Sequence, residues 1–225
     1  MTTRIHIIKT WMSDTFLIEA EAGLVLVDTG PPRSEGRILA RLHALGRADL
    51  RLIFLTHAHY DHFGSAAALK RLTGAPIAIH RIDADDLAQA QTTLGSVQGI
   101  AWLAKVGLPL LEAILPVTPV PADLLLDDGD RLDEFGLDAQ IIHTPGHTLG
   151  SSTLLVENRL AFVGDLISML GKPHAQRRFA VDWQLQAQSL HRLQQFQPQE
   201  VYCGHGRQPL SGDIFRQLPS FQPRL

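Results

Sequence analysis

The six residues from His57 to His62 include three histidines and one aspartate, in the stretch Thr-His-Ala-His-Tyr-Asp-His that begins at Thr56. A buried imidazole needs hydrogen-bond partners, and three of them close together would be costly to satisfy without a cation. A divalent metal ion removes this cost. The spacing therefore predicts a metal site, in preference to a solvated histidine cluster on a surface loop.

Other residues that can bind metals recur later in the chain, each beside a glycine. His147 lies in Thr-Pro-Gly-His-Thr, Asp165 follows Val-Gly at the end of an apolar run, and His205 lies in Gly-His-Gly. Nearer the N-terminus, Asp28 lies in Val-Asp-Thr-Gly. In order and in local context, these five motifs resemble those of the metallo-β-lactamase-fold hydrolases. The resemblance spans the chain from Asp28 to His205.

Short apolar runs that end in these motifs indicate the elements that must position them. The pattern predicts helices at 36–45, 65–72, 83–93, 100–117 and 182–196, and strands at 5–9, 16–19, 24–28, 50–55, 76–80, 123–126, 131–135, 137–143, 152–156, 160–163 and 201–203. The first three strands suit an antiparallel meander. Strands that end repeatedly in metal-binding loops, together with the resemblance, imply an α+β fold, a four-layer αββα sandwich of two mixed β-sheets with helices on both outer faces.

The resemblance implies two metal sites built from seven residues: His57, His59 and His147 at the first, Asp61, His62 and His205 at the second, and Asp165 as a bridge between them. We expect two divalent metal ions per chain, zinc above all, with iron and manganese as alternatives. Such a pair lowers the pKa of bound water from about 15.7 toward about 7. Asp61 and Asp165 are the two ligands also expected to take part in catalysis.

Other residues are expected to support the site without binding metal. In the family, the counterpart of Asp28 orients the histidine loop by hydrogen bonds, and Thr56 can help in the same way. Four residues near the ligands could contact substrate: Tyr60 inside the metal motif, and Lys172, His174 and Arg177 after Asp165.

The ligand types favour one branch of the family. An aspartate at position 165, together with His62, resembles glyoxalase II and the quorum-quenching lactonases, so we expect hydrolysis of an ester, thioester or lactone by a metal-bound hydroxide. Only 20 residues follow His205, where glyoxalase II carries a helical region that grips glutathione, which argues against the glutathione thioester itself.

Two alternatives remain. An N-acyl homoserine lactone lactonase is the first, although residues 166–168 lack the tyrosine that those lactonases carry after the bridging aspartate. A mononuclear iron persulfide dioxygenase is the second, because such enzymes use the residues that match His57, His147 and Asp165.

Residues 83–120 differ in character from the rest of a predicted single domain spanning 1–225 and could form a helical lid insertion. Within them, 100–117 is strongly apolar and could cover the substrate or bury itself against a second copy in a homodimer. Lys105, Glu112 and two prolines interrupt it too often for a transmembrane span.

Composition limits the partners of the chain. The 225 residues carry a net charge of −3 and no run of Lys or Arg longer than a pair, which argues against nucleic acid and for a small-molecule substrate. No apolar stretch is long enough for a membrane span, and no signal peptide is evident. A single cysteine, Cys203, fits a reducing compartment, so we expect a cytoplasmic location.

Overall fold

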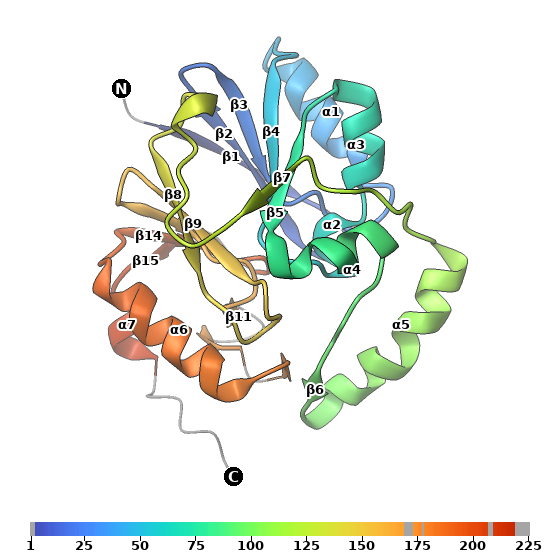
Figure 1. Cartoon of the computed structure of the whole chain (residues 1–225), viewed down its shortest axis with the longest axis vertical. Helices are drawn as coiled ribbons and strands as arrows, with labels where there is room; N and C mark the ends of the chain where they lie inside the picture. Colours follow the sequence, from blue (N-terminus) through green and yellow to red (C-terminus); the bar gives the residue numbers. More distant parts are fainter. Residues whose placement is uncertain (1–2, 169–172, 177, 207–208, 219–225) are drawn as a thin grey trace.

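The computed structural model describes residues 3–168, 173–176, 178–206 and 209–218, which build two mixed β-sheets (Figure 1). The first sheet has the strand order β1-β2-β3-β4-β5-β7. Its strands are β1 (Arg4–Lys9), β2 (Asp14–Ala20), β3 (Gly23–Val27), β4 (Leu50–Leu55), β5 (Ile77–His80) and β7 (Leu124–Leu126). The first three strands pair antiparallel, as predicted, and β3, β4, β5 and β7 pair parallel.

The second sheet has the order β15-β14-β10-β9-β8. Its strands are β8 (Ala139–His143), β9 (Ser152–Val156), β10 (Leu160–Phe162), β14 (Glu200–Tyr202) and β15 (Leu210–Ser211). All its pairs are antiparallel except β10 with β14.

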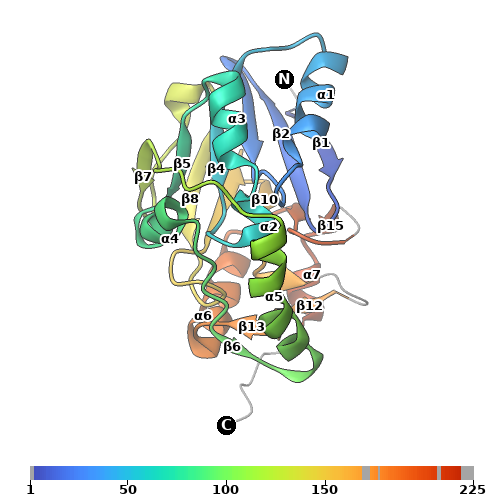
Figure 2. The ribbon, with the colours of Figure 1, turned by 90° about the vertical axis from the view of Figure 1, so that its right-hand side faces the viewer.

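Three apolar clusters separate four layers. Between the sheets, Phe16 and Phe54 of the first sheet belong to the same buried cluster as Phe162 of the second. On the outer face of the first sheet lie α1 (Glu35–Ala44) and α3 (Ala66–Thr73), and on that of the second lie α6 (Trp183–Gln195) and α7 (Ile214–Gln217), as Figures 1 and 2 show. The predicted αββα sandwich is therefore confirmed.

Alternation along the strands decides which side chains face which layer. In β2, Leu17 joins the cluster under α1 and α3, while its neighbours Phe16 and Ile18 join the cluster between the sheets. All three are almost fully buried. A strand buried on both faces reads as a continuous apolar run, because successive side chains point to opposite sides.

The connection from β5 to β7 contains most of the unusual structure. It passes through η1 (Arg81–Asp83), α4 (Ala84–Gln89), β6 (Ser96–Val97), η2 (Gly99–Ala101) and α5 (Trp102–Ile114). Strand β6 pairs antiparallel with β13 (Phe179–Ala180), and β11 (Ile167–Ser168) pairs with β12 (His174–Ala175). Helix α5 lies at the margin of the molecule (Figure 1). No helix in the described parts of the chain is long and apolar enough to cross a membrane.

Two predicted elements are wrong in detail. Residues 131–135 do not form a strand: Asp133–Phe135 is the 3₁₀ helix η3, and Arg131 makes only an isolated bridge to Gln140. The guanidinium of Arg131 binds both Asp133 and Asp138, which favours a compact turn over an extended backbone. The helix predicted at 83–93 ends at Gln89, because Ala90 adopts a left-handed backbone with φ 52°.

Candidate metal centre

Every predicted ligand lies just beyond the carboxyl end of a strand. The Thr56–His62 loop follows β4 and runs into the short helix α2 (Tyr60–Phe63), and His147 lies between β8 and β9. Asp165 follows β10, and His205 follows β14. Because β10 and β14 run parallel, their ends meet at one edge of the second sheet. The loops are joined by main-chain hydrogen bonds, including Ser152 N–H to Thr56 O and Gly204 N–H to Gly164 O.

The structure brings three imidazoles together at the first site. The ligand atoms of His57, His59 and His147 all lie within 4.8 Å of one another, and all three residues are buried. Nδ1 of His59 lies 2.9 Å from Nε2 of His147. Three converging imidazole nitrogens are a common protein contribution to a catalytic zinc site, with one coordination position left for water or substrate.

A second group of ligand atoms lies beside the first. The ligand atoms of Asp61, His62 and His205 also lie within 4.8 Å of one another. Oδ2 of Asp61 is 3.3 Å from Nε2 of His205 and 3.8 Å from Nε2 of His62. This group mixes carboxylate with imidazole, a donor set that suits zinc, iron or manganese.

Asp165 lies between the two groups with one oxygen toward each. Its Oδ1 is 3.4 Å from Nε2 of His62 and 3.3 Å from Nε2 of His205. Its Oδ2 is 3.6 Å from Nε2 of His147. A carboxylate in this position can bind two metal ions at once.

Unsatisfied atoms at the centre show that the residues fit metal ions. Nε2 of His57, Nε2 of His62 and Oδ1 of Asp165 are buried and have no hydrogen-bond partner among the described residues. A buried polar atom without a partner costs about 1–3 kcal/mol. These three atoms all face the centre, so a bound cation would satisfy them together.

Each imidazole uses its other nitrogen in a hydrogen bond outside the centre. The partners are Thr56 Oγ1 for His57, Thr93 O for His59, Asp28 Oδ2 for His62, Phe179 O for His147 and Met12 O for His205. The four carboxylate or carbonyl oxygens can only accept, so in those four rings the outer nitrogen carries the proton and the inner nitrogen can bind metal.

Burial and neighbouring charges give the two groups different protonation states. At the first site, burial and the adjacent imidazoles lower the pKa of His57 and His59, and that of His147 to about 4. These rings are therefore neutral at pH 7, the form that binds metal. At the second site, burial opposes charge on His62, yet Asp28, Asp61 and Asp165 raise its pKa to about 10.

Asp28 and Thr56 lie where an orienting role requires. Thr56 donates its backbone N–H to Oδ1 of Asp28 over 2.8 Å, and its Oγ1 lies 2.9 Å from Oδ2. Oγ1 of Thr56 is also 3.0 Å from Nδ1 of His57. Asp28 therefore reaches His62 directly and His57 through Thr56.

Glycine at position 204 lets two ligands approach the backbone. A Cβ atom there would lie 2.5 Å from Oδ1 of Asp165 and 2.5 Å from Cε1 of His62. Both distances are shorter than real Cβ atoms show, so any side chain would displace a ligand. Close packing therefore explains why glycine precedes His205.

The residues predicted to contact substrate have mixed outcomes. Tyr60 is 1% exposed and donates its hydroxyl to Leu115 O over 2.7 Å, and its contact with substrate stays a prediction. His174 lies in β12 opposite Ser168, and its Nε2 is buried without a hydrogen-bond partner among the described residues. Lys172 and Arg177 lie outside the described residues.

Several groups that orient the centre were not predicted from the sequence. The carbonyls of Met12, Thr93 and Phe179 have no sequence signature, because every residue has a carbonyl. Asp83 is also buried beside the centre, and its carboxylate accepts hydrogen bonds from both metal loops. Its one signal in the sequence is its position, because it is an acidic residue that follows a predicted strand by three residues.

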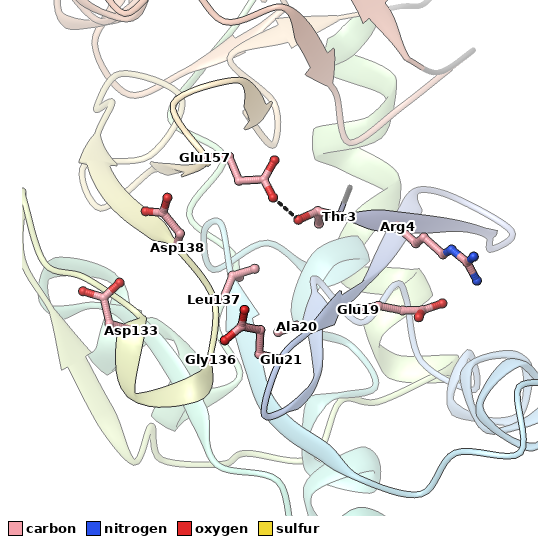
Figure 3. A pocket seen from close by; sticks show the side chains of 10 residues that line it. All are labelled: Thr3, Arg4, Glu19, Ala20, Glu21, Asp133, Gly136, Leu137, Asp138 and Glu157. Atoms are coloured by element: carbon pink, nitrogen blue, oxygen red, sulfur yellow. Dashed lines mark hydrogen bonds between the residues drawn. The ribbon is translucent and has the colours of Figure 1, made fainter. Parts of the chain in front are cut away.

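A surface hollow of about 800 Å³ is lined by none of the predicted metal ligands (Figure 3). Half of its ten lining residues are acidic: Glu19, Glu21, Asp133, Asp138 and Glu157. Several already have partners within the protein: Glu19 pairs with His6, Asp133 with Arg131, and Glu157 with Arg159.

Comparison with known proteins agrees with this geometry. Residues 8–205 match the model of the metallo-beta-lactamase superfamily. A hydroxyacylglutathione hydrolase from Pseudomonas aeruginosa is 36% identical over 122 residues, 53% of this chain and 34% of the relative. The matched stretch thus covers about a third of that relative's length.

Two further proteins match over longer stretches. A probable metallo-hydrolase from Methanocaldococcus jannaschii is 28% identical over 162 residues, 72% of this chain and 70% of the relative. The crystal structure of TTHA1623 in a di-iron-bound form superposes with a TM-score of 0.73 at 26% identity, covering 99% of this chain and all of the other. The chain therefore belongs to the metallo-β-lactamase superfamily.

Proposed function

We propose that this protein holds two divalent metal ions and hydrolyses an ester, thioester or lactone bond in a small molecule. The position of Asp165 carries the proposal. One of its oxygens faces His147 of the first site, and the other faces His62 and His205 of the second. The centre would then act as one unit with a shared carboxylate.

Different residues of the centre have different proposed roles. When bound, the metal ions supply a water of lowered pKa and an electrophile for the substrate carbonyl. His57, His59 and His147 would hold the first ion, and Asp61, His62 and His205 would hold the second, with Asp165 between them. Asp61 and Asp165 balance the positive charge. We propose these two carboxylates as the catalytic residues.

A thioester is the bond that the comparisons favour. Curated relatives named hydroxyacylglutathione hydrolase support it, although this chain spans only about a third of the length of the first of them. A lactone remains the alternative within the same chemistry, because the same polarised carbonyl is attacked in both. A screen should therefore contain thioesters, esters and N-acyl homoserine lactones.

Zinc is the metal that we propose, with iron and manganese as alternatives for the same ligands. The related structure in a di-iron-bound form supports iron as a member of this set. A mononuclear dioxygenase would need only His57, His147 and Asp165. It would not use the second group of ligands, Asp61, His62 and His205, so the presence of that group favours the two-metal hydrolase.

Metal content per chain tests this proposal, measured by elemental mass spectrometry on tag-free protein purified without chelators. We expect nearly two zinc ions per chain and hydrolysis of at least one substrate in the screen. Asp61→Ala should retain about one ion and lose hydrolysis, whereas Asp85→Ala, on the exposed face of α4, should retain both. One iron per chain, unchanged in Asp61→Ala, would contradict the proposal and direct tests to persulfides.

We further propose that residues 1–225 act as one domain and as a homodimer through α5. Trp102, Leu103, Val106, Leu110 and Ile114 are each more than half exposed. The helix's charged side chains instead bond within the chain, Lys105 to Gly95 O and Glu112 to Thr92. A second copy would cover this uncharged face.

The lone buried cysteine supports a cytoplasmic location.

A further inference from the structure

Asp83 is a buried carboxylate that the proposed reaction does not use directly. It is 4% exposed and lies at the end of η1, three residues after β5. Its Oδ2 accepts the backbone N–H of Ala58 over 3.0 Å and the hydroxyl of Thr148 over 2.7 Å. Its Oδ1 accepts the backbone N–H of Gly150 over 2.7 Å. The described residues form no ion pair with Asp83, so these three hydrogen bonds hold its carboxylate in place.

The donors belong to the two loops of the first metal site. Ala58 lies between His57 and His59, and Thr148 directly follows His147. One carboxylate thus joins the neighbours of all three imidazoles. The joint is tightly packed, because a Cβ atom on Gly150 would lie 2.4 Å from Oδ1 of Asp83.

The segment that follows Asp83 makes further contacts with the same site. Oγ1 of Thr92 accepts the backbone N–H of Tyr60 over 3.1 Å, and Thr93 O lies 3.1 Å from Nε2 of His59. Strand β6 pairs with β13, whose Phe179 carbonyl lies 3.0 Å from Nδ1 of His147. Residues 83–97 therefore orient the first site from several directions.

The second metal site is oriented by other parts of the chain. Asp28 holds His62, and Met12 O holds His205. Ser13 donates its hydroxyl to the carbonyl of Asp61 over 2.5 Å. None of these contacts involves residues 83–97.

We infer that Asp83 is a positioning residue that sets the metal affinity of the first site and leaves that of the second nearly unchanged. The inference rests on the proposed two-metal centre. Orienting partners of metal ligands typically change metal affinity by about 10–100-fold. Asp83 contacts residues next to the ligands and not the ligands themselves. Its effect on metal affinity should therefore be limited to the first site, whose two loops it connects.

Asp83→Asn is the variant that tests this inference. It keeps the size of the side chain, but one oxygen becomes an NH₂ group that cannot accept. Whichever way the amide turns, at least one donor faces another donor. We expect zinc affinity at the first site, measured by competition with a chromophoric chelator, to fall about 10–100-fold.

Single-site backgrounds identify which site has changed. In Asp61→Ala only the first site remains, and adding Asp83→Asn should remove its zinc at limiting metal. In His59→Ala only the second site remains, and adding Asp83→Asn should change its affinity less than twofold. Asp85→Asn removes the same charge from an exposed position of α4 and is the matched control.

Equal losses at both sites, or no loss at either, would overturn the inference. If Asp83→Asn does not fold, Thr148→Val removes one donor without changing charge, and it should show a smaller loss at the first site alone. Wild-type protein that binds fewer than two metal ions would instead contradict the proposed function, so the two failures are distinguishable.

Discussion

Oδ2 of Asp28 lies 2.8 Å from Nδ1 of His62, and both side chains are buried. Asp28 also has a left-handed backbone with φ 58°, which few residues other than glycine, asparagine and aspartate adopt readily. The turn after β3 thus aims this carboxylate under the histidine loop.

Asp28→Asn should weaken the second metal site. The amide has one acceptor oxygen for two donors, so either His62 or Thr56 loses its partner. Loss of an orienting partner costs about 10–100-fold in metal affinity. Chelator competition on Asp28→Asn in the His59→Ala background measures this directly. An unchanged zinc affinity there would contradict the orienting role of Asp28.

Gly204→Ala should displace ligands without unfolding the protein. The added methyl group would meet Oδ1 of Asp165 and Cε1 of His62 at 2.5 Å each. We expect loss of most hydrolysis and of about one metal ion per chain, with a circular dichroism spectrum like that of wild type. Elemental analysis and activity assays on the same sample check this.

Gly36→Ala is the matched control for that substitution. Gly36 lies in α1, and a Cβ atom there has nothing within 4 Å. Replacing glycine by alanine inside a helix stabilises it by about 0.5–1 kcal/mol. This variant should keep both metal ions and show a slightly raised Tm. A loss of metal here would mean that the Gly204 result is not local.

His80 should make the fold sensitive to acid. Burial and the stacked ring of His143, 4.0 Å away, lower the pKa of His80, although Asp83 and Asp127 oppose them. The unfolded chain therefore binds this proton at higher pH than the folded chain. Its contribution to stability is complete above about pH 6.5 and is lost as pH falls below that value.

His80→Gln should reduce that loss. Between pH 7 and pH 5.5 the Tm of the variant should fall less than the Tm of wild type, with both proteins measured in the same excess of metal. His43→Gln, on an exposed position of α1, should lose as much Tm as wild type. Identical pH profiles for all three proteins would exclude His80 as the source.

Substitutions on α5 should separate the two subunits of the proposed homodimer. Val106 and Leu110 are both 66% exposed and one helical turn apart. Val106→Glu with Leu110→Glu places charge on the apolar face, and light scattering should report half the wild-type mass. Leu72→Glu, exposed on α3, should stay dimeric. A monomeric wild type that binds lipid vesicles would assign this face to a membrane surface instead.

The fold was predictable where one continuous apolar run makes one strand. Strands β4 and β9 begin and end at the predicted residues, because each is buried along nearly its whole length. Strands β6 and β13 have two residues each and exist only because they meet in the folded protein. No local pattern could indicate them.

In the candidate site, too, some features could be predicted from the sequence and others could not. Side chains that can bind metal were visible in the sequence, and the structure brings all seven together. Their orientation depends on carbonyls of Met12, Thr93 and Phe179, which any residue could supply. The direction of the Tyr60 hydroxyl, which points toward Leu115, is likewise not visible in the motif.

The ligands come from loops that are far apart in the chain and belong to both sheets. Metal ions held there would act as long-range cross-links, joining segments near residue 60 to segments near residue 205. Unlike a disulfide, such a link forms only when the ion binds the folded chain, so it stabilises the folded state in proportion to metal binding. With its single cysteine, this chain cannot form an internal disulfide. Its thermal stability should therefore rise with the concentration of metal, so that supply of the ion governs the lifetime of the fold as well as its activity.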